Sequence, residues 1–355
     1  MFQDLGLEGW TPQSAAVVLG LVLGLAFGML AEPSRFCLRR GLAGDALERR
    51  SALGVWSMAL AAAIIGTTAI VGLGLIDISQ HRFLAGRLPI AAIILGGAMF
   101  GAGMVLGRGC ASRLTVLAGT GNLRALSVLI VFAVLAHATL KGALAPARVW
   151  IGSFGVSIGS AASLSALPGG APLVGAMFGA GLLVWALISR APRRDLVLGG
   201  LIGILVPFGW LGTGYVLKDE FAPLPLETLA FTSAAAEGLF WWVAGTAVAP
   251  SFGVGLLGGV VFGSFATAAL GRRLAWVGFG GDTPTGQYLA GGALMGIGGV
   301  LAGGCTVGAG LAGVSLLSVG ALLALASIMM GAVAARSVMA GAGRGKAQVA
   351  MVGKS

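Results

Sequence analysis

Two glycine-rich stretches, GGAMFGAGMVLGRGC at Gly96–Cys110 and GGALMGIGGVLAGGC at Gly291–Cys305, match one another, and each ends in a cysteine. Nine of the fifteen aligned positions are identical, and each residue number in the second stretch is 195 higher than its counterpart in the first. The chain has only three cysteines, so two of them occupy equivalent points of an internal repeat. Internal repeats in a hydrophobic chain are typical of transporters with a site where the repeats meet.

The composition around these stretches indicates a membrane protein. Of the 355 residues, 57% are hydrophobic and only 10% are charged, whereas charged residues make up about a quarter of an ordinary soluble domain. The 63 glycines show no collagen period, and they suit membrane helices, in which small residues let backbones approach closely. The hydrophobicity also excludes a disordered glycine-rich chain. We therefore predict an all-α integral membrane protein.

The lengths of the apolar runs predict about nine transmembrane helices, since a span needs about 20 apolar residues. The runs are 14–31, 52–76, 89–107, 123–141, 171–189, 196–217, 251–270, 286–303 and 309–334. Segments 150–167 and 226–250 are expected to be short re-entrant or interfacial pieces. The predicted organisation is an N-terminal repeat half (1–167), a C-terminal repeat half (168–335) and a disordered cytoplasmic tail (336–355).

The distribution of basic residues predicts the orientation, because lysine and arginine favour cytoplasmic loops. With the N-terminus outside, 17 of the 22 basic residues fall inside and 5 fall outside. We therefore expect a multi-pass protein of a bacterial inner membrane with a cytoplasmic C-terminus. The first cysteine stretch then runs inward and the second outward, so the repeat is inverted. The heptapeptide GAMFGAG also recurs at Gly175–Gly181 without a cysteine, so generic small-residue packing accounts for part of the similarity.

The two Gly-Cys turns predict helices that break inside the membrane. Glycine adopts tight and left-handed backbone conformations without steric cost, and non-helical backbone at that depth must line a cavity or be buried in protein. Free N–H groups at helix starts favour an anion there. The candidate substrate-path residues at these turns are Gly109, Cys110, Ser112, Arg113, Gly304, Cys305 and Thr306.

The third cysteine, Cys37, directly follows the first predicted span in the segment EPSRFCLRRG, 32–41. Pro33 ends that helix or begins another one, and Arg35 lies two residues before the thiol. No CxxC motif or Cys–His pair occurs, so neither a metal site nor a redox dithiol is indicated, and no cofactor is expected. A single free cysteine is usually a small buried hydrophobic residue, but three cysteines at three helix breaks favour a shared role.

These motifs resemble those of the YeeE/YedE family of sulfur-compound transporters, over about residues 20–335. The resemblance rests on the motifs RFCL at 35–38, GCAS at 109–112 and GGCTVG at 303–308, in this order. It implies nine spans with short re-entrant helices and uptake of a small sulfur oxyanion, thiosulfate first. It also implies that Cys37, Cys110 and Cys305 pass the anion along, and that a small cytoplasmic sulfur-carrier protein is a partner. The sequence Ser112-Arg113-Leu114 departs from the small residues common in the family, which bears on the exact substrate.

The chemistry of arginine and thiol agrees with an anionic substrate. Arg108 and Arg113 flank Cys110, and a pore-lining arginine attracts an anion, although both side chains could instead snorkel to the cytoplasmic surface. A neutral thiol is a weak donor and a weak acceptor, and several weak contacts in series suit conduction. Two other functions stay open: an intramembrane thiol-dependent sulfur-transferring enzyme, which lacks an evident base, and a passive small-anion channel. The lipid bilayer is a further expected partner, and no nucleic acid is expected as one.

Overall fold

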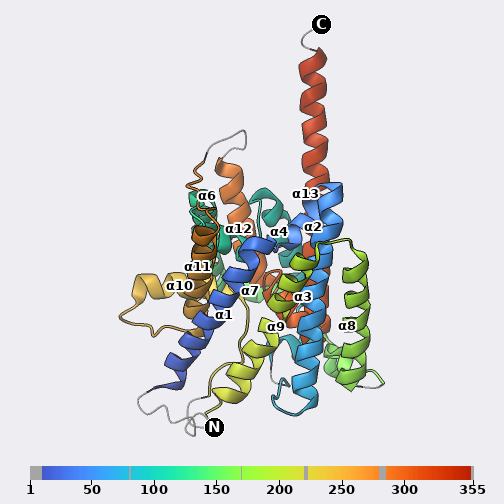
Figure 1. The fold of residues 1–355 in the computed structure, drawn as a ribbon, viewed down its shortest axis with the longest axis vertical. Coiled ribbons are helices and arrows are strands. Elements are labelled where there is room, and N and C mark those ends of the chain that lie inside the picture. The colour runs from blue at the N-terminus through green and yellow to red at the C-terminus, as the bar shows by residue number, and fades with distance from the viewer. Residues whose placement is uncertain (1–9, 80, 169, 220–222, 280–284, 353–355) are drawn as a thin grey trace.

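The computed structural model describes residues 10–79, 81–168, 170–219, 223–279 and 285–352, and in this part the chain is almost entirely helical (Figure 1). The α-helices are α1 (Pro12–Ser34), α2 (Leu38–Ala43), α3 (Ala46–Gly72), α4 (Ile90–Leu106), α5 (Ala111–Gly119), α6 (Leu123–Lys141), α7 (Ala145–Ser153), α8 (Gly170–Ile188), α9 (Arg193–Leu211), α10 (Phe231–Ala244), α11 (Phe252–Leu270), α12 (Thr285–Leu301) and α13 (Val319–Val352). Short 3-10 segments are η2 (Arg82–Leu84), η3 (Gly159–Ala162) and η4 (Leu164–Ala166), and π-helical segments are η5 (Gly212–Val216) and η6 (Gly308–Gly313). Strands β1 (Arg87–Leu88) and β2 (Val156–Ser157) pair antiparallel.

Eight helical stretches in the described residues are long and apolar enough to cross a membrane, which confirms the predicted all-α integral membrane protein. They are Pro12–Ala43, Glu48–Gly72, Ile90–Gly119, Leu123–Lys141, Gly170–Ile188, Arg193–Val216, Phe252–Leu270 and Val319–Ala340. The remaining predicted span, 286–303, forms α12, whose 17 residues are shorter than a usual crossing. The number of nine spans therefore stays a prediction.

The last predicted span differs from the structure. The run 309–334 is not one continuous helix, because η6 ends at Gly313, Leu317 adopts a left-handed φ of 57°, and α13 starts only at Val319. An unbroken apolar run does not reveal such a break. Helix α13 continues to Val352 and projects from the bundle (Figure 1); the disordered tail expected from residue 336 stays a prediction. Alanine, methionine, lysine and glutamine in this stretch are good helix formers.

Close helix packing explains why the chain is so rich in glycine. Helices α1 and α11 run parallel, with Gly20, Gly24 and Gly28 of α1 facing Gly255, Gly259 and Gly263 of α11. A Cβ atom at Gly24 would lie 2.2 Å from the carbonyl oxygen of Leu256. Only glycine permits this separation, so the two backbones gain van der Waals contact that larger residues would prevent.

The two cysteine stretches pack directly against each other in opposite directions, as an inverted repeat predicts. Gly96 of α4 lies against Gly298 of α12, and Gly103 of α4 lies against Gly291 of α12. Because Gly291 and Gly298 are the repeat counterparts of Gly96 and Gly103, the two contacts are equivalent. The helices that flank the two stretches correspond as well, because α4 also packs on α13 and α12 packs on α6.

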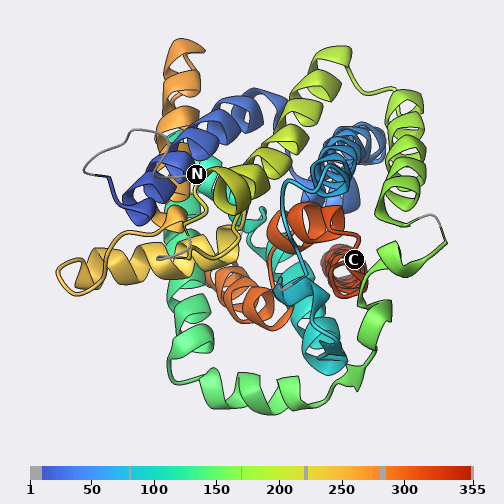
Figure 2. The same cartoon turned by 90° about the horizontal axis from the view of Figure 1, so that it is seen from below.

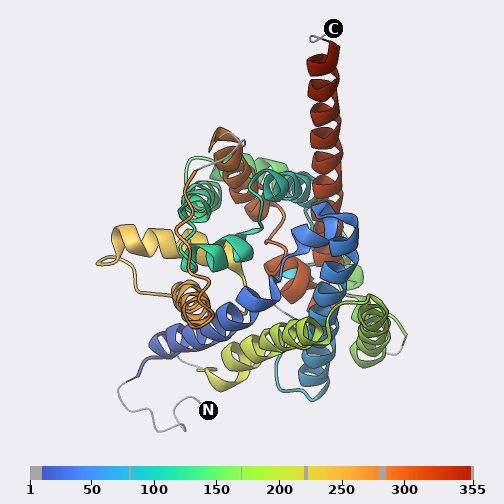
Figure 3. The same ribbon diagram turned by 45° about the horizontal axis from the view of Figure 1, so that its top comes forward.

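Other helices surround this centre. Helix α8 lies at the edge of the bundle, where it packs on α3 (Figures 1 and 3). Helix α7 and the segment after it follow the periphery from α6 toward α8 (Figure 2). Helix α10 has 14 residues, too few for a crossing, and projects sideways from the bundle (Figure 1). The expected re-entrant or interfacial pieces at 150–167 and 226–250 thus form short elements rather than spans.

Candidate functional site

All three cysteines lie at helix breaks that share one geometry. The residue two positions before each cysteine has a positive φ: 50° at Arg35, 56° at Arg108 and 78° at Gly303. A left-handed residue ends the preceding helix, and the chain then turns so that the cysteine precedes the next helical segment. Cys37 and Cys110 are the N-cap residues of α2 and α5. The cysteines are free thiols and buried.

Cys37 and Cys110 come from distant parts of the chain but form a thiol pair. Their sulfur atoms are 3.9 Å apart, within the range of a weak S–H···S hydrogen bond. Cys110 also lies 3.3 Å from the Ser112 hydroxyl and interacts with the Thr306 hydroxyl. Thr306 is adjacent to Cys305 in the chain, so the polar contacts of Cys110 extend from Cys37 to the third cysteine turn.

Cys305 sits in the turn between α12 and η6 and is fully buried from bulk solvent. Its sulfur accepts a hydrogen bond of 3.3 Å from the Gly308 amide. Gly304 beside it leaves no room for a side chain, since a Cβ atom there would lie 2.7 Å from the Ala309 nitrogen. The turn is therefore held in one conformation with the thiol at a fixed position.

A cavity of about 600 Å³ is lined by Cys305 and by residues of the loop that joins α3 to α4. Its walls come from the loop between α3 and α4, the segment before α10, the start of α10, and the cysteine turn between α12 and η6. The polar lining residues are Asp77, His81, Arg82, Glu227, Thr228, Thr232, Ser233, Glu237 and Cys305.

Arg82 is the cation of this cavity, which we call the outer cavity. Within the described residues its guanidinium forms no hydrogen bond or ion pair that would neutralise it, and it lies 5.0 Å from the centre of the Phe83 ring. The surroundings lower the pKa of Arg82 by desolvation, while the Glu227 and Glu237 carboxylates and Cys305 raise it. A cation beside a thiol and without a close ion-pair partner is suited to receive an anion.

Two neighbours of Arg82 have shifted pKa values. The pKa of Glu227 is raised to about 7, first by burial and second by the negative charge of Glu237, while the positive charge of Arg82 partly lowers it. Burial, followed by the charge of Arg82, lowers the pKa of His81 to about 4. At neutral pH His81 is therefore uncharged, and Glu227 is divided between its two protonation states.

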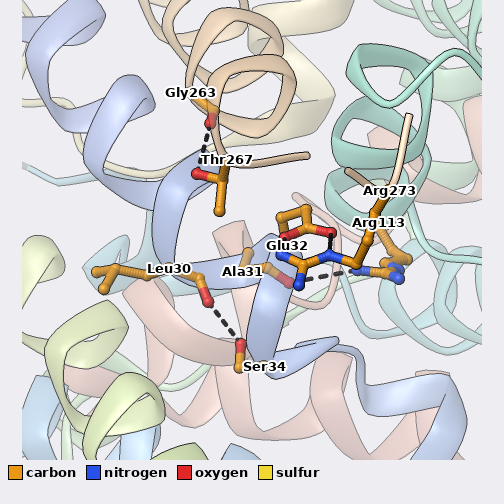
Figure 4. Close-up of polar contacts among 8 residues, drawn as sticks. All are labelled: Leu30, Ala31, Glu32, Ser34, Arg113, Gly263, Thr267 and Arg273. Carbon is orange, nitrogen blue, oxygen red and sulfur yellow. Dashed lines mark hydrogen bonds and ion pairs between the residues drawn. The ribbon is translucent and has the colours of Figure 1, made fainter. Parts of the chain in front are cut away.

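Two arginines, Arg113 and Arg273, lie at the end of α1. Arg113 is half-buried and donates a hydrogen bond of 3.2 Å to the Ala31 carbonyl, at the end of α1 (Figure 4). Its charge acts on Cys37 and Cys110. Close by, Glu32 accepts two hydrogen bonds from Arg273, from Nε at 2.9 Å and from the terminal nitrogen at 2.5 Å (Figure 4).

The structure brings most of the residues predicted from sequence together, but not all of them. Ser112 and Thr306 contact Cys110, while Gly109 and Gly304 are buried in the turns. Arg35, by contrast, is exposed at the end of α1 and serves as its left-handed C-cap. Arg108 is also exposed, with its guanidinium 5.7 Å from the Tyr288 ring centre.

Sequence reasoning missed the outer cavity. In the sequence, Arg82 is only one of the basic residues expected outside the membrane. Glu227 and Thr232 lie in the segment 226–250, which was expected to be re-entrant or interfacial. None of these residues belongs to a motif in the sequence. A carboxylate in an otherwise apolar region, such as Glu227, was the available signal, because intramembrane charges are costly and usually functional.

The profile of the sulphur transport family matches residues 33–334, which include all three cysteines and the walls of the outer cavity. The chain belongs to this family. Among curated proteins it is similar to the thiosulfate transporter TsuA of Spirochaeta thermophila, with 26% identity over 312 residues covering 81% of this chain and 88% of the relative. It is also similar to the thiosulfate transporter TsuA of Escherichia coli, with 25% identity over 323 residues covering 81% and 85%. The protein is thus a multi-pass transporter of sulphur compounds rather than an enzyme.

Proposed function

We propose that this transporter takes up thiosulfate through the outer cavity and passes it along the three cysteines. The observation that carries the proposal is that Cys305 and Arg82 line the same cavity. Thiosulfate is a dianion with a soft terminal sulfur, and this pairing offers a cation for the charge and a thiol for the sulfur. The names of the two TsuA relatives support the choice of thiosulfate.

The path proposed beyond Cys305 follows the contacts of Cys110. From Cys305 the anion passes Thr306 to reach Cys110, and from there the thiol of Cys37 is 3.9 Å away. Each thiol binds weakly, so the anion is held briefly at each position and is not trapped. Arg113 provides positive charge beside Cys37 and Cys110, which favours the anion on the far side of the path.

The proposed direction follows from the predicted topology. The outer cavity is lined by the loop between α3 and α4, and the positive-inside distribution supports an orientation with this loop outside a bacterial inner membrane. Thiosulfate would therefore enter from the periplasmic side and leave at the basic cytoplasmic side. A small sulfur-carrier protein with a reactive cysteine is the proposed receiver, docking near residues 35–50 or 190–194.

Uptake by purified protein in proteoliposomes tests the proposal. We expect accumulation of radiolabelled thiosulfate in vesicles that contain the protein, and competition by unlabelled thiosulfate. Protein-free vesicles and vesicles with the Cys305→Ala variant serve as controls. Correctly inserted protein that carries another sulfur anion but not thiosulfate would contradict the proposed substrate.

A further inference from the structure

The inverted correspondence between the two halves extends beyond the cysteine stretches. Adding 195 to the numbers of Glu32 and Phe36 leads to Glu227 and Phe231, which are again glutamate and phenylalanine. Both phenylalanines are buried, and both pack on Phe27, with ring centres 6.3 Å and 5.0 Å away. The first segment precedes α2, and the second leads into α10, which begins at Phe231.

Hydrogen bonds at the starts of α6 and α13 also correspond, since the number 318 is 195 higher than 123. Leu123 at the start of α6 donates an amide hydrogen bond to the Val277 carbonyl at 3.0 Å. On the other side, Ser318 before α13 donates a hydroxyl hydrogen bond to the Phe83 carbonyl at 2.6 Å. The loop that carries Arg82 is therefore the outer counterpart of the loop that carries Arg273, the residue paired with Glu32.

Thr232 occupies the position in the second half that Cys37 occupies in the first, because 232 is 195 higher than 37. Cys37 forms its thiol pair with Cys110, whose repeat counterpart is Cys305. The outer counterpart of the Cys37–Cys110 pair is therefore Thr232 with Cys305, and both of these residues line the outer cavity.

The hydroxyl of Thr232 has no partner. The residue is only 6% exposed, and its Oγ1 atom forms no hydrogen bond within the described residues. A buried hydroxyl without a partner costs free energy and calls for an explanation. Threonine divides between two side-chain rotamers in a helix, so this hydroxyl is able to turn toward the cavity that the residue lines.

The chemistry of the Thr232 hydroxyl complements that of the Cys305 thiol, which lines the same cavity. A hydroxyl is a stronger donor than a thiol and prefers oxygen acceptors, and its hydrogen bond to a charged oxygen is stronger than one to a neutral group. An anion with oxygens at one end and a sulfur at the other could use both residues at once, with its oxygens toward Thr232 and its sulfur toward Cys305.

From these observations we infer that Thr232 is a substrate-binding residue of the outer cavity, where its hydroxyl donates a hydrogen bond to an oxygen of the sulfur oxyanion. This inference rests on the proposed function and adds to it a residue that selects for the oxygens of the substrate. The inner thiol pair and the outer hydroxyl–thiol pair would then be two versions of one repeated site.

The test replaces the hydroxyl by a methyl group of similar size in Thr232→Val. Loss of a hydrogen bond to a charged group is expected to raise the KM for thiosulfate uptake roughly tenfold or more, with a Vmax close to that of the parent. Thr232→Ser, which keeps the hydroxyl, should restore most of the affinity. The matched control is Thr68→Val, since Thr68 is also 6% exposed but donates its hydrogen bond to the Ile64 carbonyl, away from the cavity.

Size-exclusion chromatography of detergent-solubilised protein and calorimetric titration with thiosulfate complete the experiment. A folded Thr232→Val protein with weaker thiosulfate binding supports the inference. Parental KM and parental binding in that variant would overturn it, and so would equal losses in Thr232→Val and Thr232→Ser. These outcomes test the inference on the condition that the parent protein transports thiosulfate. A parent that does not transport it refutes the proposed function instead, independently of Thr232.

Discussion

At the scale of single residues, Cys110 is the connection between the two ends of the proposed path. It contacts Cys37 and Ser112 directly and Thr306 beside the third cysteine. We predict that Cys110→Ala inserts and folds, because the lost contacts and the small void cost on the order of 1 kcal/mol, but that thiosulfate uptake collapses. Cys110→Ser should restore little if the soft sulfur matters. Uptake assays at equal protein levels check this, and parental uptake by Cys110→Ala would refute the cysteine relay.

Glu227 is the residue whose protonation is expected to affect uptake. With its pKa raised to about 7, it loses its negative charge as the pH falls from 8 to 6. The neutral form no longer repels a dianion or attracts Arg82, so uptake should increase toward low pH. The other ionisable groups that line the cavity are Asp77, His81, Arg82 and Glu237, and His81, with a pKa of about 4, stays neutral over this range.

The measurement is the initial uptake rate between pH 6 and 8 at constant membrane potential. Since the neutral fraction of a group with a pKa of about 7 changes about tenfold over this range, the rate should change by up to that factor. Glu227→Gln should be fast at pH 8 and nearly independent of pH. A variant that keeps the parental pH profile would show that another group is responsible.

At the scale of helices, packing without side chains decides which elements stay together. A Cβ atom at Gly259 would lie 2.2 Å from the Leu21 carbonyl oxygen, whereas one at the adjacent Gly258 would only approach Leu21 Cδ1 at 3.9 Å. We predict that Gly259→Ala pushes α11 away from α1 and lowers the melting temperature, while Gly258→Ala leaves it unchanged or raises it slightly because alanine favours helix. Thermal unfolding of the two purified variants checks this, and equal melting temperatures would contradict it.

At the scale of the whole molecule, the orientation decides whether the outer cavity faces the supply of substrate. The sequence predicts an external N-terminus and a cytoplasmic C-terminus, and α13 projects from the end opposite the start of α1 (Figure 1). We predict that green fluorescent protein fused to the C-terminus fluoresces, since it folds in the cytoplasm, and that alkaline phosphatase fused there is inactive. The reverse pattern would place the outer cavity on the cytoplasmic side and would oppose uptake.

The sequence by itself determined the class of the protein and its three cysteine turns. Composition required a membrane, because apolar residues at this frequency cannot be kept in water. The repeat of glycines before Cys110 and Cys305 indicated broken helices, because glycine at fixed spacing marks close backbone approach and tight turns. These features are local or periodic, so the amino-acid sequence alone reveals them.

Only the tertiary structure decided which residues meet. The contact between Cys37 and Cys110 joins residues 73 positions apart, and the outer cavity joins Arg82, Glu227 and Cys305 from three separate segments. The sequence does not reveal the break at Leu317 for the same reason. Packing around the turn imposes a left-handed φ on Leu317, although leucine prefers a negative φ. Such features depend on contacts between distant segments, and no periodicity in the sequence records them.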